Sequence, residues 1–348
     1  MTHFCDLPSA EAAAGWRRSK TSAVGAVFRL CTAILPPKAQ PQRTFSALPN
    51  SGCNLTPVLL LVVVPKGTAK GDGVIELEVA AAANAVNVQA QFARVLASHG
   101  DADQARIREF AAWVENRCRL TLNVKLFVLV DILSGGEYLN VHQRALLDSE
   151  LFGRTIDEML HASLQGWYAR RLAFDDSFDR GHEFLCAGLT AGYGGLRAYD
   201  PICIELRTQF FGAADPLAYL PGDSLKVCFS GSDAFDAKLF SSAVSAHSHR
   251  QFLTATKYAD KALSNPIADW PNIVSSPADY IEAIFVGKVD VSAICIVQIL
   301  KEEYDRLLAL VVTSIGSRLQ LAEQTLVYLF RKVLAAEKEG KLSLEIVE

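Results

Sequence analysis

The sequence predicts a mainly α-helical fold built from antiparallel helix pairs. After residue 73, apolar residues recur mostly at spacings of three and four, which is the period of an amphipathic helix. Short segments rich in Gly, Asn, Asp and Pro separate these stretches, and connections of that size join helices that pack side by side. Half of the 348 residues are apolar and 21% are charged, which indicates a protein with a packed core.

The first 45 residues have the composition of a mitochondrial presequence. They carry six Lys and Arg residues against Asp6 and Glu11, and they are rich in Ala and Ser, as transit peptides are. The stretch Arg43-Thr44-Phe45-Ser46 resembles presequence cleavage sites with an arginine shortly before an aromatic residue and a small residue after it. The resemblance implies cleavage after Phe45 and a mature chain that begins at Ser46. Plastid targeting and a simple basic tail are the alternatives.

Residues 46–73 are predicted to be a linker that contains one short strand-like segment, the apolar run 58–64 between Pro57 and Pro65. Residues 74–348 form the predicted helical body, either undivided or divided near residues 215–225. A spacing of 57 and then 56 residues between Phe127, Phe184 and Phe240 also allows an irregular α-solenoid. The helices expected in order are 74–97, 102–115, 122–133, 141–150, 155–169, 182–191, 234–246, 253–263, 278–285, 292–316 and 317–338.

Charge and cysteine usage narrow the class of protein. Of the chain's 34 basic and 38 acidic residues, 28 and 36 lie after residue 45, and a net-acidic body disfavours broad nucleic-acid binding. The eight cysteines lie at least 17 residues apart, which is neither a zinc-type pairing nor a disulfide framework. The longest apolar run has seven residues, far fewer than the roughly 20 of a membrane-spanning helix. We therefore expect an intracellular protein without a membrane span.

Two loops have the outline of a phosphate-binding site without its residues. The glycine-containing loop 66–73 follows the strand-like segment, but it lacks the Gly-Lys-Ser/Thr ending and the G-x-G-x-x-G spacing. The stretch Ser230-Gly231-Ser232-Asp233 lacks the second adjacent glycine of ATP-pyrophosphatase loops. We interpret the first loop as a connection and the second as a helix N-cap, so no cofactor is predicted.

The candidate metal ligands and acid–base groups are histidines and carboxylates in two short segments. His247-Ser248-His249 has no acidic or cysteine partner at ligand spacing, so it is interpreted as a helix end. The acidic group 175–179 follows Arg170-Arg171. Paired carboxylates of this kind hold a cation or do acid–base work, but the spacing lacks the Gly and terminal Glu of an EF-hand. We interpret it as a solvated turn or helix cap, so no catalytic or metal residue is predicted.

Two segments carry family resemblances. The stretch 229–233, running into Leu239-Phe240, resembles the helix-pair units of organellar helical-repeat proteins of the FAST-kinase-like and octotricopeptide type, over at most residues 122–263. This resemblance implies a helical solenoid that acts on organellar RNA. Residues 262–266 and 281–287 resemble PCI-domain subunits, which implies a cytosolic scaffold.

The presequence, the apolar helical body and the lack of readable site chemistry together predict the role. We expect a non-catalytic accessory or structural subunit of a large mitochondrial assembly, such as the mitochondrial ribosome or a respiratory or ATP-synthase complex. Its place would be the matrix or the matrix side of the inner membrane, and its partners would be protein subunits. An organellar RNA-binding factor and a cytosolic PCI-type scaffold are the alternatives. The last apolar segment, 319–334, either closes the core or packs on a partner.

Overall fold

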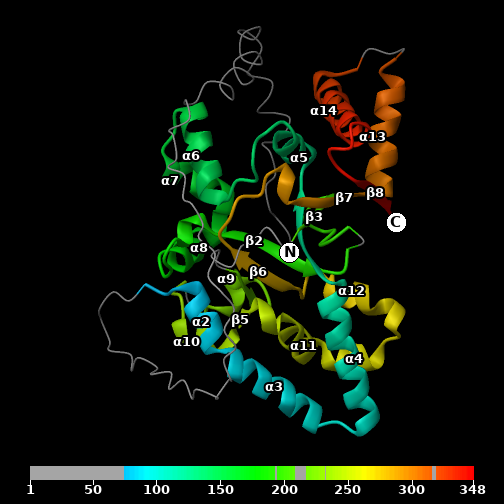
Figure 1. Cartoon of the computed structure of the whole chain (residues 1–348). Helices are drawn as coiled ribbons and strands as arrows, with labels where there is room; N and C mark the ends of the chain where they lie inside the picture. The colour runs from blue at the N-terminus through cyan, green and yellow to red at the C-terminus, as the bar shows by residue number, and fades with distance from the viewer. Residues whose placement is uncertain (1–73, 193, 208–216, 232, 316–318) are drawn as a thin grey trace, which may run out of the picture. The chain divides into compact units, whose positions relative to one another are not determined.

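The computed structural model describes residues 74–192, 194–207, 217–231, 233–315 and 319–348 (Figure 1). The predicted presequence with Arg43, Phe45 and Ser46, and the predicted linker with its strand-like segment, lie outside the described residues.

An eight-stranded mixed sheet forms the centre of the described chain (Figure 1). The strand order is β5-β4-β6-β2-β1-β3-β7-β8. All neighbouring strands are antiparallel except β7 and β8, which are parallel. The strands are β1 (Arg119–Val124), β2 (Leu185–Thr190), β3 (Ile202–Leu206), β4 (Leu217–Leu220), β5 (Ser245–Ala246), β6 (Ile281–Phe285), β7 (Ile294–Leu300) and β8 (Leu344–Val347).

The prediction of a mainly α-helical protein is therefore wrong. The segments expected as helices at 182–191, 278–285 and the start of 292–316 contain β2, β6 and β7, and 122–133 begins inside β1. β6 and β7 are short, mostly apolar strands of a sheet covered on both faces, and all five residues of β6 are buried. Such a strand lacks the alternation of a half-exposed strand, so periodicity does not distinguish it from a buried helix. The segment 281–287 that resembled a PCI-type helix is mostly β6.

Helices cover one face of the sheet and form the larger core with it. This core combines buried side chains of six strands with those of the surrounding helices, among them Phe110, Tyr258, Trp270 and Phe330. Its helices are α3 (Ala85–Ala97), α4 (Asp101–Arg117), α5 (Leu126–Leu133), α11 (Arg250–Ser264), α12 (Trp270–Val274), α13 (Lys301–Thr313) and α14 (Leu321–Lys338).

The opposite face is covered in two parts. Over β2, β4 and β6, a smaller core includes Phe174, Phe178, Phe184 and Phe240. It involves α2 (Leu77–Ala83), α8 (Tyr168–Asp175), α9 (Ser224–Val227) and α10 (Ala237–Ala243). Helices α6 (Val141–Phe152) and α7 (Ile156–Leu164) lie side by side as a hairpin before α8 (Figure 1). Their small cluster of buried side chains is separate from both cores.

Over β1, β3 and β7, polar side chains hold the connection between β2 and β3. Asn123 donates to the carbonyl oxygens of Gly194 and Asp200, at 2.9 and 2.8 Å. The Gly194 N–H donates to the side-chain oxygen of Gln298 at 2.9 Å. A Cβ on Gly195 would lie 2.6 Å from the Asn123 oxygen, so this connection lies directly on the sheet and requires glycine there. Within the described ranges, no helix is both long and apolar enough to cross a membrane.

Candidate metal centre

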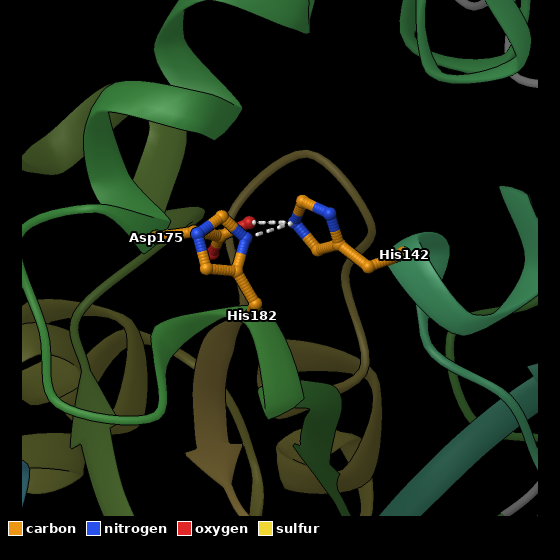
Figure 2. A group of neighbouring side chains, drawn as sticks. All are labelled: His142, Asp175 and His182. Atoms are coloured by element: carbon orange, nitrogen blue, oxygen red, sulfur yellow. Dashed lines mark hydrogen bonds and ion pairs between the residues drawn. The ribbon is translucent and has the colours of Figure 1, made fainter. Parts of the chain in front are cut away.

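Two histidines and one aspartate from separate elements meet beside the α6–α7 hairpin. His142 lies in the first turn of α6, Asp175 ends α8, and His182 lies in the short 3-10 helix η3 (Gly181–Glu183). Their nearest ligand-type atoms all lie within 4.8 Å of one another. Figure 2 shows both imidazole rings and the carboxylate turned toward a common point. It is the one group of three or more His, Cys, Asp or Glu side chains with this geometry among the described residues.

The start of α6 is fixed by a capping box, and this places His142. The Asn140 side chain accepts from the Gln143 N–H at 2.8 Å, and the Gln143 side chain accepts from the Asn140 N–H at 2.9 Å. These two bonds satisfy N–H groups that would otherwise lack partners at a helix start. The Asn140 amide also donates to the His182 carbonyl at 2.9 Å. The same residue therefore begins the helix of one ligand and contacts the backbone of another.

The chain between Asp175 and His182 is held in a tight turn. A Cβ on Gly181 would lie 1.9 Å from the Asp175 carbonyl oxygen, so only glycine fits there without a backbone shift. The rings of Phe174, Phe178 and Phe184 pack together beneath the turn, with centroids 4.8 to 6.2 Å apart. The Ile75 backbone is bonded on both sides of Phe178, to Ser177 and Asp179. These contacts fix the positions of two ligands.

The distances at the centre are those of a converging set. His142 Nε2 lies 2.6 Å from Asp175 Oδ2 and 3.2 Å from His182 Nδ1. Side-chain exposure is 0% for Asp175, 14% for His142 and 54% for His182. The centre is therefore closed on the aspartate side and open to solvent on the His182 side.

A carboxylate outside the group orients His182. Its Nε2 lies 2.9 Å from Asp176 Oδ1, and an ionised carboxylate only accepts hydrogen bonds. In the neutral ring this hydrogen bond assigns the proton to Nε2, which turns the lone pair of Nδ1 toward the centre. Metal-ligating histidines commonly have such a carboxylate partner, which fixes the ring and its tautomer.

Arg171 is the buried partner of Asp175. Its Nε donates to Asp175 Oδ2 at 2.6 Å from one turn earlier on α8, and its Nη1 lies 3.8 Å from Cys186 Sγ. Burial alone would lower the pKa of the Arg171 guanidinium, but the charge of Asp175 raises that pKa overall, so the guanidinium stays charged. Asp175 Oδ1 is buried and has no hydrogen-bond partner. One carboxylate oxygen is thus shared by two donors while the other is left unsatisfied.

Other candidate residues lie elsewhere. His247 and His249 fall in the 3-10 helix η5 (His247–His249); His247 Nδ1 is 2.8 Å from the Tyr219 hydroxyl, and His249 Nε2 is 2.7 Å from the Gln89 amide. Burial lowers the pKa of His247 to about 4. Asp236, a few residues after the predicted cap at 230–233, caps α10. The loop 66–73 lies outside the described residues.

The interpretation of the acidic group 175–179 as a solvated turn is correct for only part of the segment. Asp176 and Asp179 are exposed, whereas Asp175 is fully buried. Sequence reasoning missed His142 and His182 as its partners. They lie 33 residues before and seven residues after Asp175, and only the packing of α6 against η3 brings them together. The preceding Arg171, four residues before Asp175, was the available signal of a buried pair.

Comparison with protein-family models, with curated proteins and with solved structures finds no match to this chain.

Proposed function

We propose that this protein binds one divalent transition-metal ion through His142, Asp175 and His182. The observation that carries the proposal is the convergence of three ligand-type atoms, from three elements, within 4.8 Å. Two imidazoles and one carboxylate suit zinc, and also iron(II) in sites that keep open coordination positions. The proposal concerns metal binding and assigns no reaction.

The spacing of the ligand atoms supports this. Ligands about 2.0–2.1 Å from a tetrahedral ion lie roughly 3.3 Å apart, close to the 3.2 Å between His142 Nε2 and His182 Nδ1. The 2.6 Å between His142 Nε2 and Asp175 Oδ2 would have to widen by about 0.7 Å to reach this spacing when an ion replaces the shared proton.

Local charge supports a cation as well. Asp175 and Asp176 contribute two negative charges next to the centre, and Arg171 contributes one positive charge. The pairing of Asp175 with Arg171 holds the carboxylate in place, as partners outside the ligand set do in metal sites.

Titration of the purified protein with zinc, followed by calorimetry, tests the proposal. We expect one equivalent of zinc to bind. His142→Ala or His182→Ala is expected to weaken zinc binding by more than about tenfold, because loss of a residue that only supports a metal ligand already weakens binding about 10- to 100-fold. His161→Ala is the matched control, because His161 is an exposed histidine 4.0 Å from Asp157 on α7 and outside the centre. Equal zinc binding by the wild type and both ligand variants would refute the proposal. Iron(II) titration shows which ion is preferred.

A second candidate function is the predicted role as a subunit of a large mitochondrial assembly. It is favoured by an exposed apolar surface on two packed helices. Leu308 and Val312 are exposed on α13, Ile315 is exposed just after its end, and Leu321 and Tyr328 are exposed on α14. Exposed apolar patches of this kind commonly mark interaction sites.

This second proposal is tested in native cells with a full-length, C-terminally tagged chain. Size-resolved profiling of isolated mitochondria is expected to find it in a large complex, and N-terminal sequencing is expected to find Ser46 first. A stable monomer absent from every large complex would exclude the subunit role. An uncleaved cytosolic chain would exclude the mitochondrial address.

A further inference from the structure

The α6–α7 hairpin has little core of its own. Its cluster of buried side chains comprises Ala145, Leu160 and Leu164 among the described residues, whereas its outer surface exposes Leu147, Leu151, Phe152 and other apolar side chains. Segments with few buried apolar contacts open locally at a lower free energy than the core of the same protein. Of the elements around the candidate metal centre, the hairpin therefore depends most on contacts outside its own small cluster of buried side chains.

The polar attachments of the hairpin to η3 and to the end of α8 coincide with the candidate metal centre. Asn140, the N-cap of α6, donates to the His182 carbonyl at 2.9 Å. His142 reaches Asp175 at 2.6 Å and His182 at 3.2 Å. The other ligands, Asp175 and His182, lie on the tight turn that Gly181 and the phenylalanine cluster hold. The centre thus takes one ligand from the weakly packed hairpin and two from a well-packed turn.

We propose that the metal ion is a clasp that fixes the α6–α7 hairpin to α8 and η3, so that metal occupancy regulates opening of the hairpin. This inference rests on the proposed metal binding. Opening of the hairpin separates His142 from the other two ligands, which leaves the ion with fewer protein ligands. The ion therefore binds the closed form more tightly and shifts the population toward it.

Mass action sets the size of the effect. If the open form does not retain the ion, closure is favoured by a factor of one plus the ratio of free metal to Kd. At free zinc about 100 times Kd, hairpin amides that exchange through this opening are expected to exchange about 100-fold more slowly. Amides of α11 that exchange without hairpin opening are expected to change much less.

Hydrogen exchange of the full-length protein, with and without zinc, tests the clasp. The expected result is zinc-dependent protection of residues 141–164 that rises with free zinc, and loss of this protection in His182→Ala. The α11 amides report whether that variant is folded, and His161→Ala is expected to keep the protection. Zinc binding in calorimetry with unchanged hairpin exchange would overturn the clasp and leave the metal centre standing. Absence of zinc binding would overturn both.

Discussion

At the scale of single residues, Gly181 shows how one position fixes the geometry of the centre. A Cβ there would lie 1.9 Å from the Asp175 carbonyl oxygen and 2.7 Å from its carbon. Both are backbone atoms, so no side-chain rotation relieves the contact. Gly181 is not a proposed ligand, but the turn between the ligands Asp175 and His182 requires it.

Gly181→Ala is expected to destabilise the protein by about 2 kcal/mol, because forcing extra atoms into a packed site usually costs 1–3 kcal/mol. It is also expected to weaken zinc binding, since the turn must move. Urea denaturation and zinc titration measure the two effects. Gly166→Ala is the control, because its Cβ would meet no atom within 4 Å. Equal stability of both variants would show that the turn adjusts freely.

The surroundings of Glu282 predict that the stability of the protein depends on pH. Glu282 is 6% exposed on β6, and its Oε2 accepts from the Ser224 N–H at 2.7 Å. Burial, and then the nearby charge of Asp223, raise the pKa of Glu282 from 4.5 to about 7. The folded state therefore keeps a proton on Glu282 between these two pH values, where the unfolded chain has lost it.

The stability that Glu282 contributes falls as the pH rises. Because the folded-state pKa is raised, the contribution of Glu282 to stability is complete below about pH 4.5 and is lost as the pH rises through about 7. At about 1.4 kcal/mol per pKa unit, the loss is roughly 3 kcal/mol. Glu282→Gln cannot ionise, and it keeps an oxygen to accept from Ser224. Urea denaturation at about pH 5 and about pH 8 is expected to show that the free energy of unfolding falls less with pH in Glu282→Gln than in the wild type. An equal fall in both proteins would contradict the raised pKa of Glu282.

At the scale of elements, α14 shows what the sequence could predict and what it could not. A helix was expected over 317–338, and the structure has one at Leu321–Lys338. The wide apolar stripe divides into a buried part, which includes Val327, Phe330 and Val333, and an exposed part with Leu321 and Tyr328. The helical period of the apolar residues predicts the helix. It does not predict which of these residues are buried, because that depends on where α5 and α13 lie.

Phe330→Ala is expected to cost about 3–5 kcal/mol, because it empties a fully buried site. Phe330 is 0% exposed, and its ring packs edge-on against Tyr304 of α13 at 5.5 Å. Leu321→Ala on the same helix is the control, since Leu321 is 76% exposed and such changes usually stay within about 0.5 kcal/mol. Chemical denaturation compares the two. Equal losses would mean that α14 is not attached as the structure shows.

The strands are the elements that the sequence did not allow us to predict. β6 and β7 are almost wholly apolar and rich in Ile, and both are buried in a sheet with covered faces. Their burial on two sides removes the period-two signal. The expected helices 102–115, 141–150 and 253–263, by contrast, match α4, α6 and α11. In α4, for example, the buried residues Ile107, Phe110, Ala111 and Val114 recur at spacings of three and four, which is the period of a helix.

At the scale of the whole molecule, the same contrast explains the candidate centre. Asp175 could be noticed in a local acidic group, but its significance depends on His142 and His182, and they are joined by the fold. The residues that connect them are a cap at Asn140 and a tight turn at Gly181. Neither has a sequence signature specific to metal binding. Local pattern in a single sequence therefore draws attention to the acidic group, but it does not reveal the burial of Asp175 or its histidine partners.

At the same scale, we expect β8 to limit self-association of the whole molecule, because it covers the edge of β7. Beyond the apolar strand β7, β8 is the last strand of the sheet among the described residues. β8 pairs with β7 from Leu344 to Val347, and the carbonyl of Ser343, just before β8, accepts from the Val297 N–H at 2.8 Å. Without it, the unpaired edge would be the uncharged sequence Ile-Cys-Ile-Val-Gln-Ile-Leu of β7. Apolar edges of this kind pair readily with other chains.

Removal of residues 343–348 is therefore expected to leave a chain that aggregates, because β7 becomes an open edge while the helices of the main core keep their contacts. Light scattering and size-exclusion chromatography at equal protein concentration measure this, with removal of Glu348 alone as the control. Gln298 would also lose Glu345, to which its amide donates at 3.0 Å, so a loosened β2–β3 connection is expected beside the new edge. A truncated chain that stays as soluble as the control would show that β7 is protected by something other than β8.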